Sequence, residues 1–146
     1  MNTFGARYLV LHPGACLKAG PQTGIRQLVK TLQAVLANSE KVTILLETMA
    51  GKGTEIGTNF KQLRQILDLV NHPRLGICFD TCHVWDSGVD IQNVDKLVRE
   101  LQDLKLIDKI AVFHVNDSKN GLGSHKDRHA NLGQGQIGLP TLREIV

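Results

Sequence analysis

The stretch Leu75-Gly76-Ile77-Cys78-Phe79-Asp80-Thr81-Cys82-His83 places a short apolar run directly before an aspartate, with a histidine three residues later. Such a run is typical of a strand that is buried on both faces, as in a parallel sheet. The aspartate then lies beyond the carboxyl end of the strand, where parallel α/β proteins place their chemistry. The stretch therefore predicts a parallel sheet with functional groups at its carboxyl edge.

Three more apolar runs of the same kind alternate with helical patterns. The runs are Tyr8–Leu11, Val42–Leu46 and Ile110–Phe113. Apolar residues recur at helical spacing over 25–36, 60–70 and 91–104, and Pro140 is typical of the first turn of a fourth helix. Right-handed crossovers would make the four strands parallel. The chain is thus predicted to be an α/β protein built from about four parallel βα units.

Two architectures fit this order of elements. One is an open doubly wound sheet, and the other is part of a (β/α)8 TIM barrel. A complete barrel needs about 250 residues, whereas this chain has 146. The barrel interpretation therefore predicts a single partial TIM-barrel domain over residues 1–146.

Composition and charge favour a protein of the cell interior. A hydrophobic fraction of 42% is enough for a packed core, and 21% of charged residues of mixed sign argues against disorder. No apolar run approaches the roughly 18 residues needed to cross a bilayer, and Met1–Gly5 does not resemble the start of a secretory signal. The net charge of +3 is only a weak indication of a polyanionic partner. Three cysteines, with Cys78 and Cys82 four residues apart, are expected to be reduced thiols.

A residue that can bind a metal follows each of the four apolar runs. These residues are His12, Glu47, Asp80 and His114. A single example would carry little information, because an aspartate after a strand is often the N-cap of a helix. Four at one edge are more specific, since two carboxylates buried together are costly unless a cation neutralises them. The pattern predicts a metal centre at the carboxyl edge of the sheet.

Three further candidates lie nearby in the sequence. His83 follows Asp80 by three residues, and Asp127 and His129 form an Asp-x-His pair that an extended segment would present on one side. The full set of four histidines, two aspartates and one glutamate suits zinc or manganese rather than a structural zinc held by cysteines. Seven ligands are too many for one ion, so we expect two or three, as in enzymes that hydrolyse phosphate esters.

Five motifs resemble the endonuclease IV family of apurinic/apyrimidinic endonucleases. They are Leu11-His12-Pro13-Gly14, Leu46-Glu47-Thr48-Met49-Ala50-Gly51, Phe79-Asp80-Thr81-Cys82-His83, His114-Val115-Asn116-Asp117-Ser118-Lys119, and Asp127-Arg128-His129 followed by Asn131-Leu132-Gly133-Gln134-Gly135. The resemblance covers the whole chain, in order and with similar gaps. It implies a (β/α)8 barrel with up to three Zn²⁺ ions at the C-terminal face, one of which Mn²⁺ could replace.

The resemblance also implies how the ligands are divided. His12 would bind the first metal, Glu47 would bridge the first and second, Asp80 and His114 would bind the second, and His83, Asp127 and His129 would hold the third. A further histidine for the first metal and a glutamate for the second belong to family segments that would precede Met1 and follow Val146. The chain therefore resembles a fragment that lacks the N-terminal and C-terminal barrel segments.

The activity implied by the resemblance is base excision repair of double-stranded DNA. The enzyme would hydrolyse the phosphodiester 5′ to an abasic site, leaving a 3′-hydroxyl and a 5′-deoxyribose phosphate, with Glu47 as the catalytic residue that orients the nucleophile. Lys52, Lys119, Lys126 and Arg128 would contact the DNA backbone. No membrane partner is expected, and the full-length form is expected to be a monomer, in the cytoplasm of a bacterium or in the nucleus or mitochondrion of a eukaryote.

Two alternatives stay open. A sugar isomerase or epimerase barrel also carries metal ligands at its strand ends, although it does not need the additional site formed by His83, Asp127 and His129. An inactive metal-binding fragment is the other. The glycine-rich loop 133–138 predicts either a close approach of the backbone to a ligand or a turn before the last helix. Trp85 is expected to pack rather than to stack on a base.

Overall fold

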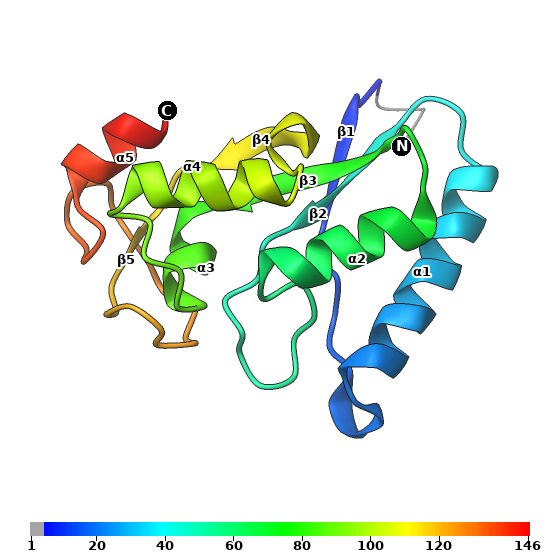
Figure 1. Ribbon diagram of the computed structural model, residues 1–146, viewed down its shortest axis with the longest axis horizontal. Helices are drawn as coiled ribbons and strands as arrows, with labels where there is room; N and C mark the ends of the chain where they lie inside the picture. The colour runs from blue at the N-terminus through cyan, green and yellow to red at the C-terminus, as the bar shows by residue number, and fades with distance from the viewer. Residues whose placement is uncertain (1–4) are drawn as a thin grey trace.

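A computed structural model describes residues 5–146, and its centre is one sheet of four parallel strands (Figure 1). The strands, in spatial order, are β1 (Tyr8–Leu11), β2 (Thr43–Glu47), β3 (Leu75–Asp80) and β4 (Ile110–His114). Each strand pairs in parallel with the next one along the chain. All four predicted strands are confirmed, and three of them extend one residue further, to include the metal-binding residue that follows the apolar run.

Helices connect the strands as predicted, but α1 begins four residues before the apolar pattern of 25–36 and α4 begins three residues after the start of the pattern of 91–104. The long helices are α1 (Pro21–Ala37), α2 (Phe60–Val70) and α4 (Val94–Asp103), and α5 (Leu139–Ile145) contains Pro140 in its first turn. The helix predicted over 91–104 begins only at Val94, because the side chain of Asn93 caps it by accepting a hydrogen bond from the Lys96 amide. Figure 1 shows α2 and α4 lying in front of the sheet, with α1 beside α2.

Several short elements are absent from the sequence-based prediction. They are η2 (Leu17–Ala19), α3 (Thr81–Asp86), η3 (Ile107–Lys109), and the strands β5 (Asp117–Ser118) and β6 (His129–Ala130), which pair antiparallel with each other. Elements of two to six residues are too short for their hydrophobic period to show in a sequence. Two of them, α3 and β6, carry predicted metal ligands, so they matter more for the site than their length suggests.

The two central strands are buried along nearly their whole length, whereas the two outer strands are not. All residues of β3 are buried, but β1 is half-buried throughout and Phe113 of β4 is 44% exposed. The expectation that all four apolar runs are buried on both faces is therefore wrong for β1 and β4. The reason is their position, since each pairs with only one strand among residues 5–146 and the sheet leaves their outer side uncovered.

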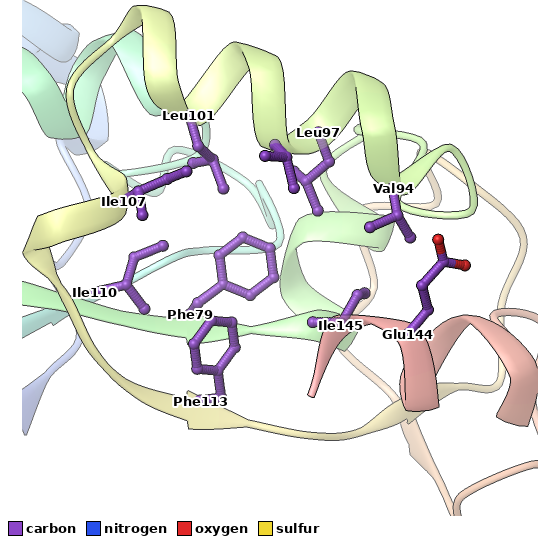
Figure 2. Close-up of a pocket in the computed structure, with 10 residues that line it drawn as sticks. Phe79, Val94, Leu97, Leu101, Ile107, Ile110, Phe113, Glu144 and Ile145 are labelled. Atoms are coloured by element: carbon purple, nitrogen blue, oxygen red, sulfur yellow. The ribbon is translucent and has the colours of Figure 1, made fainter.

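An apolar pocket of about 240 Å³ lies where β4, α4 and α5 meet (Figure 2). Phe79 and Phe113 form its floor, with ring centroids 5.5 Å apart, and Leu97, Leu101 and Ile145 lie around it. None of the seven predicted metal ligands lines this pocket. No helix within residues 5–146 is both long enough and apolar enough to cross a membrane. The prediction about a secretory signal rests on a segment that lies almost wholly outside the described residues.

Arg74 holds the end of α1 against the start of the sheet. Its guanidinium donates hydrogen bonds to the backbone oxygens of Leu36 (2.7 Å), Val42 (3.0 Å) and Ser39, and to the Ser39 hydroxyl (3.0 Å). One of these acceptors, the Leu36 carbonyl, lies in the last turn of α1, where carbonyls have no partner within the helix, and the others follow the end of the helix. A planar fork of donors satisfies several of them at once, which a lysine ammonium does not do in the same geometry.

Replacing Arg74 with lysine is expected to lower the free energy of unfolding by about 1–3 kcal/mol, because buried carbonyls lose their partners. Urea denaturation of the purified chain measures the change. Arg99, which is exposed on α4, provides the matched control. Arg99→Lys should change the free energy of unfolding by no more than about 0.5 kcal/mol. Equal stabilities of the two variants would show that the Arg74 contacts are not stabilising.

Candidate metal centre

The seven predicted ligands come together at the carboxyl edge of the sheet. His12 directly follows β1, and Glu47, Asp80 and His114 are the last residues of β2, β3 and β4. His83 lies on α3, Asp127 in the loop before β6, and His129 on β6. The arrangement follows from the topology, since parallel strands present their carboxyl ends at one edge of the sheet. The ends of β3 and β4 lie opposite each other, with Asp80 paired to His114, whereas Glu47 at the end of β2 lies opposite Cys78, two residues before the end of β3.

Glu47 lies at the middle of the group and is only 4% exposed. One carboxylate oxygen, Oε2, is 3.0 Å from Nε2 of His12. The other, Oε1, is 2.9 Å from Nδ1 of His114 and 3.5 Å from Nδ1 of His83. A single buried carboxylate thus contacts three imidazoles that come from three separate segments, namely the residue after β1, α3 and the end of β4.

Asp80 is fully buried and its two oxygens have different partners. Oδ1 accepts the backbone N–H of His83 at 2.9 Å, so Asp80 is the N-cap of α3. Oδ2 accepts the side-chain amide of Asn116 at 2.6 Å and lies 3.8 Å from Nδ1 of His114 and 3.9 Å from Nε2 of His129. Asp80 therefore caps α3 with Oδ1 and faces His114 and His129 with Oδ2.

His83, Asp127 and His129 form the third part of the group. Asp127 Oδ1 lies 3.0 Å from Nε2 of His83 and 3.3 Å from Nε2 of His129. The other ring nitrogen of His83, Nδ1, is 2.9 Å from the carbonyl oxygen of Thr48. A carbonyl only accepts hydrogen bonds, so Nδ1 carries the proton in the neutral ring and Nε2 is left with its lone pair facing Asp127. This fixes which nitrogen of His83 is available to a cation.

The Asp127–His129 segment is not extended, which corrects the sequence-based expectation. Asp127 has a φ of 52°, in the left-handed region, so the chain turns at this residue before it enters β6. The two side chains still face each other because β6 pairs with β5, where Ser118 lies opposite His129. The two side chains lie together, 3.3 Å apart, but a turn rather than strand alternation brings them there.

The carboxylates of the group raise the pKa of two titratable side chains beside them, those of His83 and Cys78. Burial lowers the pKa of His83, but the carboxylates of Asp80, Asp127 and Glu47 outweigh it, and the net pKa is raised above 6.5. Burial also raises the pKa of the Cys78 thiol to about 12, with a contribution from Glu47 and Asp80, so this cysteine stays neutral. Cys78 is fully buried, as expected for a small hydrophobic side chain.

The residues present fit divalent cations. Residues 5–146 contain three sets of side chains whose donor atoms lie within 4.8 Å of one another inside each set. The sets are His12, Glu47 and His83; Glu47, Cys78 and His114; and Asp80, His83 and His129. Within residues 5–146, neither Glu47 nor Asp80 has a lysine or arginine within salt-bridge distance. Two buried carboxylates that face imidazoles and neutral donors, but no lysine or arginine, leave negative charge that a cation would neutralise. Imidazole nitrogens with carboxylate oxygens are a donor set that suits zinc or manganese.

Zinc binding to the metal-free chain is expected to weaken as the pH falls. Because the pKa of His83 is raised above 6.5, the ring holds a proton in the metal-free state up to a higher pH, and a cation must displace that proton. Calorimetric titration in buffers of different ionisation enthalpy measures the protons released. His83→Gln should release fewer protons than the unaltered chain at the same pH. The same release from both proteins would contradict a proton on His83.

The glycine-rich loop 133–138 approaches a carboxylate of the protein itself. Asp117 is fully buried and accepts backbone N–H groups of this loop, among them those of Gly133 (3.1 Å), Gly135 (3.1 Å) and Ile137 (2.9 Å). The loop then enters α5, so the expectation of a turn before the last helix is met. The group that its backbone approaches closely is Asp117, which the sequence did not single out.

The four predicted DNA-contacting residues are exposed on loops that carry or adjoin the predicted ligands. Lys52 lies in the loop after β2, Lys119 follows β5, and Lys126 and Arg128 flank Asp127. Trp85 is 6% exposed and its indole N–H donates to the carbonyl oxygen of Asn120 at 2.9 Å. Trp85 therefore packs within the fold, as predicted, and its ring is not presented to a ligand.

Comparison with known proteins identifies the family. The whole chain, residues 1–146, matches the family described as xylose isomerase-like TIM barrel. The chain belongs to this family. The open doubly wound sheet is thereby excluded, and the four parallel strands are part of a barrel of this xylose isomerase-like type.

Relatives within the family include bacterial proteins named for endonuclease IV. The chain is 50% identical to the probable endonuclease 4 of Mycoplasmopsis synoviae over 146 residues, which are 100% of this chain and 53% of that protein. Endonuclease IV of Thermus thermophilus superposes with a TM-score of 0.79 at 32% identity, over 99% of this chain and 51% of that chain. The chain spans about half the length of the curated relatives it matches. The resemblance to endonuclease IV is confirmed.

A second solved structure connects the fold with a metal. The IOLI protein, whose crystal structure contains a zinc atom, superposes with a TM-score of 0.69 at 25% identity, over 99% of this chain and 52% of that chain. Its zinc belongs to that protein and is not a finding about this one. It does establish that a barrel of closely similar backbone holds zinc.

Proposed function

We propose that the protein is a metal-dependent endonuclease of DNA base excision repair. It would hydrolyse the phosphodiester 5′ to an abasic site in double-stranded DNA and leave a 3′-hydroxyl and a 5′-deoxyribose phosphate. The observation that carries the proposal is the buried Glu47 carboxylate in contact with His12, His83 and His114. A second group around Asp80 and Asp127 lies directly beside it.

The names of the relatives support this class of activity, and the zinc in a protein of the same fold supports the choice of metal. His12 and Glu47 would hold a first ion, Glu47, Asp80 and His114 a second, and His83, Asp127 and His129 a third. Zinc is proposed for all three, with manganese as a substitute at one. When bound, such ions supply Lewis-acid stabilisation of the negative charge that develops on a phosphate.

The residues of the chain have separate tasks in this proposal. Glu47, with both oxygens directed at imidazoles, keeps the ligands of the first two ions at a fixed separation and is proposed as the catalytic residue that orients the attacking water. The exposed Lys52, Lys119, Lys126 and Arg128 would bind the DNA backbone without reading its sequence. Binding of this kind weakens steeply as the salt concentration rises. A monomer in the cell interior is proposed as the working form.

Incubation with a duplex oligonucleotide that carries one abasic analogue tests the proposal. The purified chain, loaded with zinc, is expected to cut on the 5′ side of the lesion, to leave an undamaged duplex intact, and to lose activity when a chelator removes the metal. Absence of cleavage by the zinc-loaded chain would refute nuclease activity for these 146 residues. Conversion of a ketose by the same preparation would favour the isomerase alternative, and zinc binding without either activity would favour a metal-binding fragment.

A further inference from the structure

We infer that Asp86 is a positioning residue that fixes the place of Asp127, and with it the part of the centre formed by His83, Asp127 and His129. The inference deepens the proposed metal centre and rests on it. Asp86 was not among the residues singled out in the sequence, and it does not belong to any of the donor sets that could hold an ion within the described chain. Asp86 therefore acts through the residues that it contacts and not as a ligand of an ion.

Asp86 is the last residue of α3 and is fully buried. Its Oδ2 accepts the backbone N–H of Asp127 at 2.8 Å, and its Oδ1 accepts the hydroxyl of Ser118 at 2.7 Å. Both oxygens are thus engaged, and no lysine or arginine lies within salt-bridge distance among residues 5–146. A buried carboxylate without a cationic partner is stable only when strong donors satisfy it, which makes the Asp127 amide a contact of consequence.

The backbone N–H and the side-chain carboxylate of Asp127 both contact the same short helix, α3. From α3, Nε2 of His83 contacts the Asp127 carboxylate at 3.0 Å, and Oδ2 of Asp86 contacts the Asp127 amide. The backbone oxygen of Asp86 also accepts the N–H of His125 at 3.0 Å. Because α3 begins at the N-cap Asp80, one rigid turn connects Asp80, His83 and the loop that carries Asp127.

The loop needs such an anchor because its backbone is strained. His125 and Asp127 have φ values of 55° and 52°, in the left-handed region that residues with a side chain seldom adopt. Without the hydrogen bonds that its N–H groups donate to Asp86, a segment with two such residues would relax to other conformations and move the Asp127 carboxylate. Ligands that are fixed before the ion arrives bind it more tightly than ligands that must first be ordered.

Two substitutions separate the hydrogen bond from the charge. Asp86→Ala removes the acceptor of the Asp127 amide. Asp86→Asn keeps it, because the side-chain oxygen still faces Asp127 while the Ser118 hydroxyl turns round to accept from the new amide. We expect Asp86→Ala to weaken zinc binding about 10- to 100-fold, the usual effect of removing a residue that orients a ligand. Asp86→Asn should restore most of the affinity.

Competition of the purified chain with a chromogenic zinc chelator measures these affinities. Val29→Ala, a core substitution in α1, provides a control that lowers stability far from the centre and should keep unaltered zinc affinity. Unaltered affinity in Asp86→Ala would overturn the inference. Equal losses in Asp86→Ala and Asp86→Asn would overturn it as well, because charge rather than position would then be the cause.

Hydrogen exchange of the Asp127 amide in the metal-free chain keeps this test independent of the proposed function. If the unaltered chain binds no zinc, the metal centre is refuted, and the exchange measurement still decides on Asp86. Loss of protection at Asp127 in Asp86→Ala, with protection retained in Asp86→Asn and Val29→Ala, supports the inference. Protection retained in Asp86→Ala overturns it.

Discussion

Replacing Glu47 with glutamine is expected to lower cleavage of an abasic duplex by about a hundredfold or more, since each 1.36 kcal/mol lost from stabilisation of the transition state costs a factor of ten. The physical reason is that both carboxylate oxygens face imidazoles, that of His12 on one side and that of His114 on the other. In glutamine one of these oxygens becomes an NH₂ group, which donates rather than accepts. It would face a ring nitrogen that must keep its lone pair free for a cation.

The substitution also removes a negative charge that helps to raise the pKa of His83. NMR titration of the metal-free variant should therefore find the pKa of His83 lower than in the unaltered chain. Glu40, exposed between α1 and β2, supplies the matched control, and Glu40→Gln should leave both cleavage and the pKa of His83 unchanged. Full cleavage by the Glu47→Gln chain would remove Glu47 from the proposed mechanism.

Replacing Gly135 with alanine is expected to lower the free energy of unfolding by about 3 kcal/mol or more, because overpacking is combined with loss of buried hydrogen bonds. A Cβ atom at this position would overlap both the Ser118 carbonyl oxygen and the Asp117 carboxylate. The loop would have to move away from Asp117, whose carboxylate would then be left buried with fewer donors. Urea denaturation of the metal-free chain measures the change.

Gly121 offers a matched control within the neighbouring loop. It is exposed, and a Cβ atom added there would meet nothing within 4 Å. Gly121→Ala should therefore be neutral or slightly stabilising, since alanine restricts the unfolded chain. Equal denaturation midpoints for the two alanine variants would show that the loop adapts and that its contact with Asp117 is not needed for stability.

The sequence was sufficient to predict the sheet and the meeting of the seven candidate ligands at one of its edges, for one geometric reason. Parallel strands have their carboxyl ends at one edge, so a residue that directly follows an apolar run is placed there whatever the details of packing. Glu47, Asp80 and His114 each end a strand in the structure, as that rule requires. The approximate position of the site could therefore be predicted without any knowledge of side-chain contacts.

The supporting residues could not be predicted, because their contacts depend on loops far apart in the chain. Asp86 and the Asp127 amide are separated by 41 residues, and Asp117 reaches amides 16 to 21 residues further on. Nothing in their immediate neighbours distinguishes these aspartates from solvated surface residues. The exposure of β1 and β4 follows from their places at the two edges of the described sheet, which an apolar run by itself does not reveal.

Trp85 has a consequence for the study of the molecule in solution. It is the single tryptophan of the sequence, and it is buried one residue before Asp86, with its indole N–H bonded to the backbone of the loop that leads to Asp127. Tryptophan fluorescence of the chain therefore originates entirely from Trp85, next to Asp86 and the loop that carries Asp127. Opening of that loop would expose the indole to water and shift its emission even while the helices stay folded. The fluorescence of Trp85 therefore reports whether this loop is open or closed.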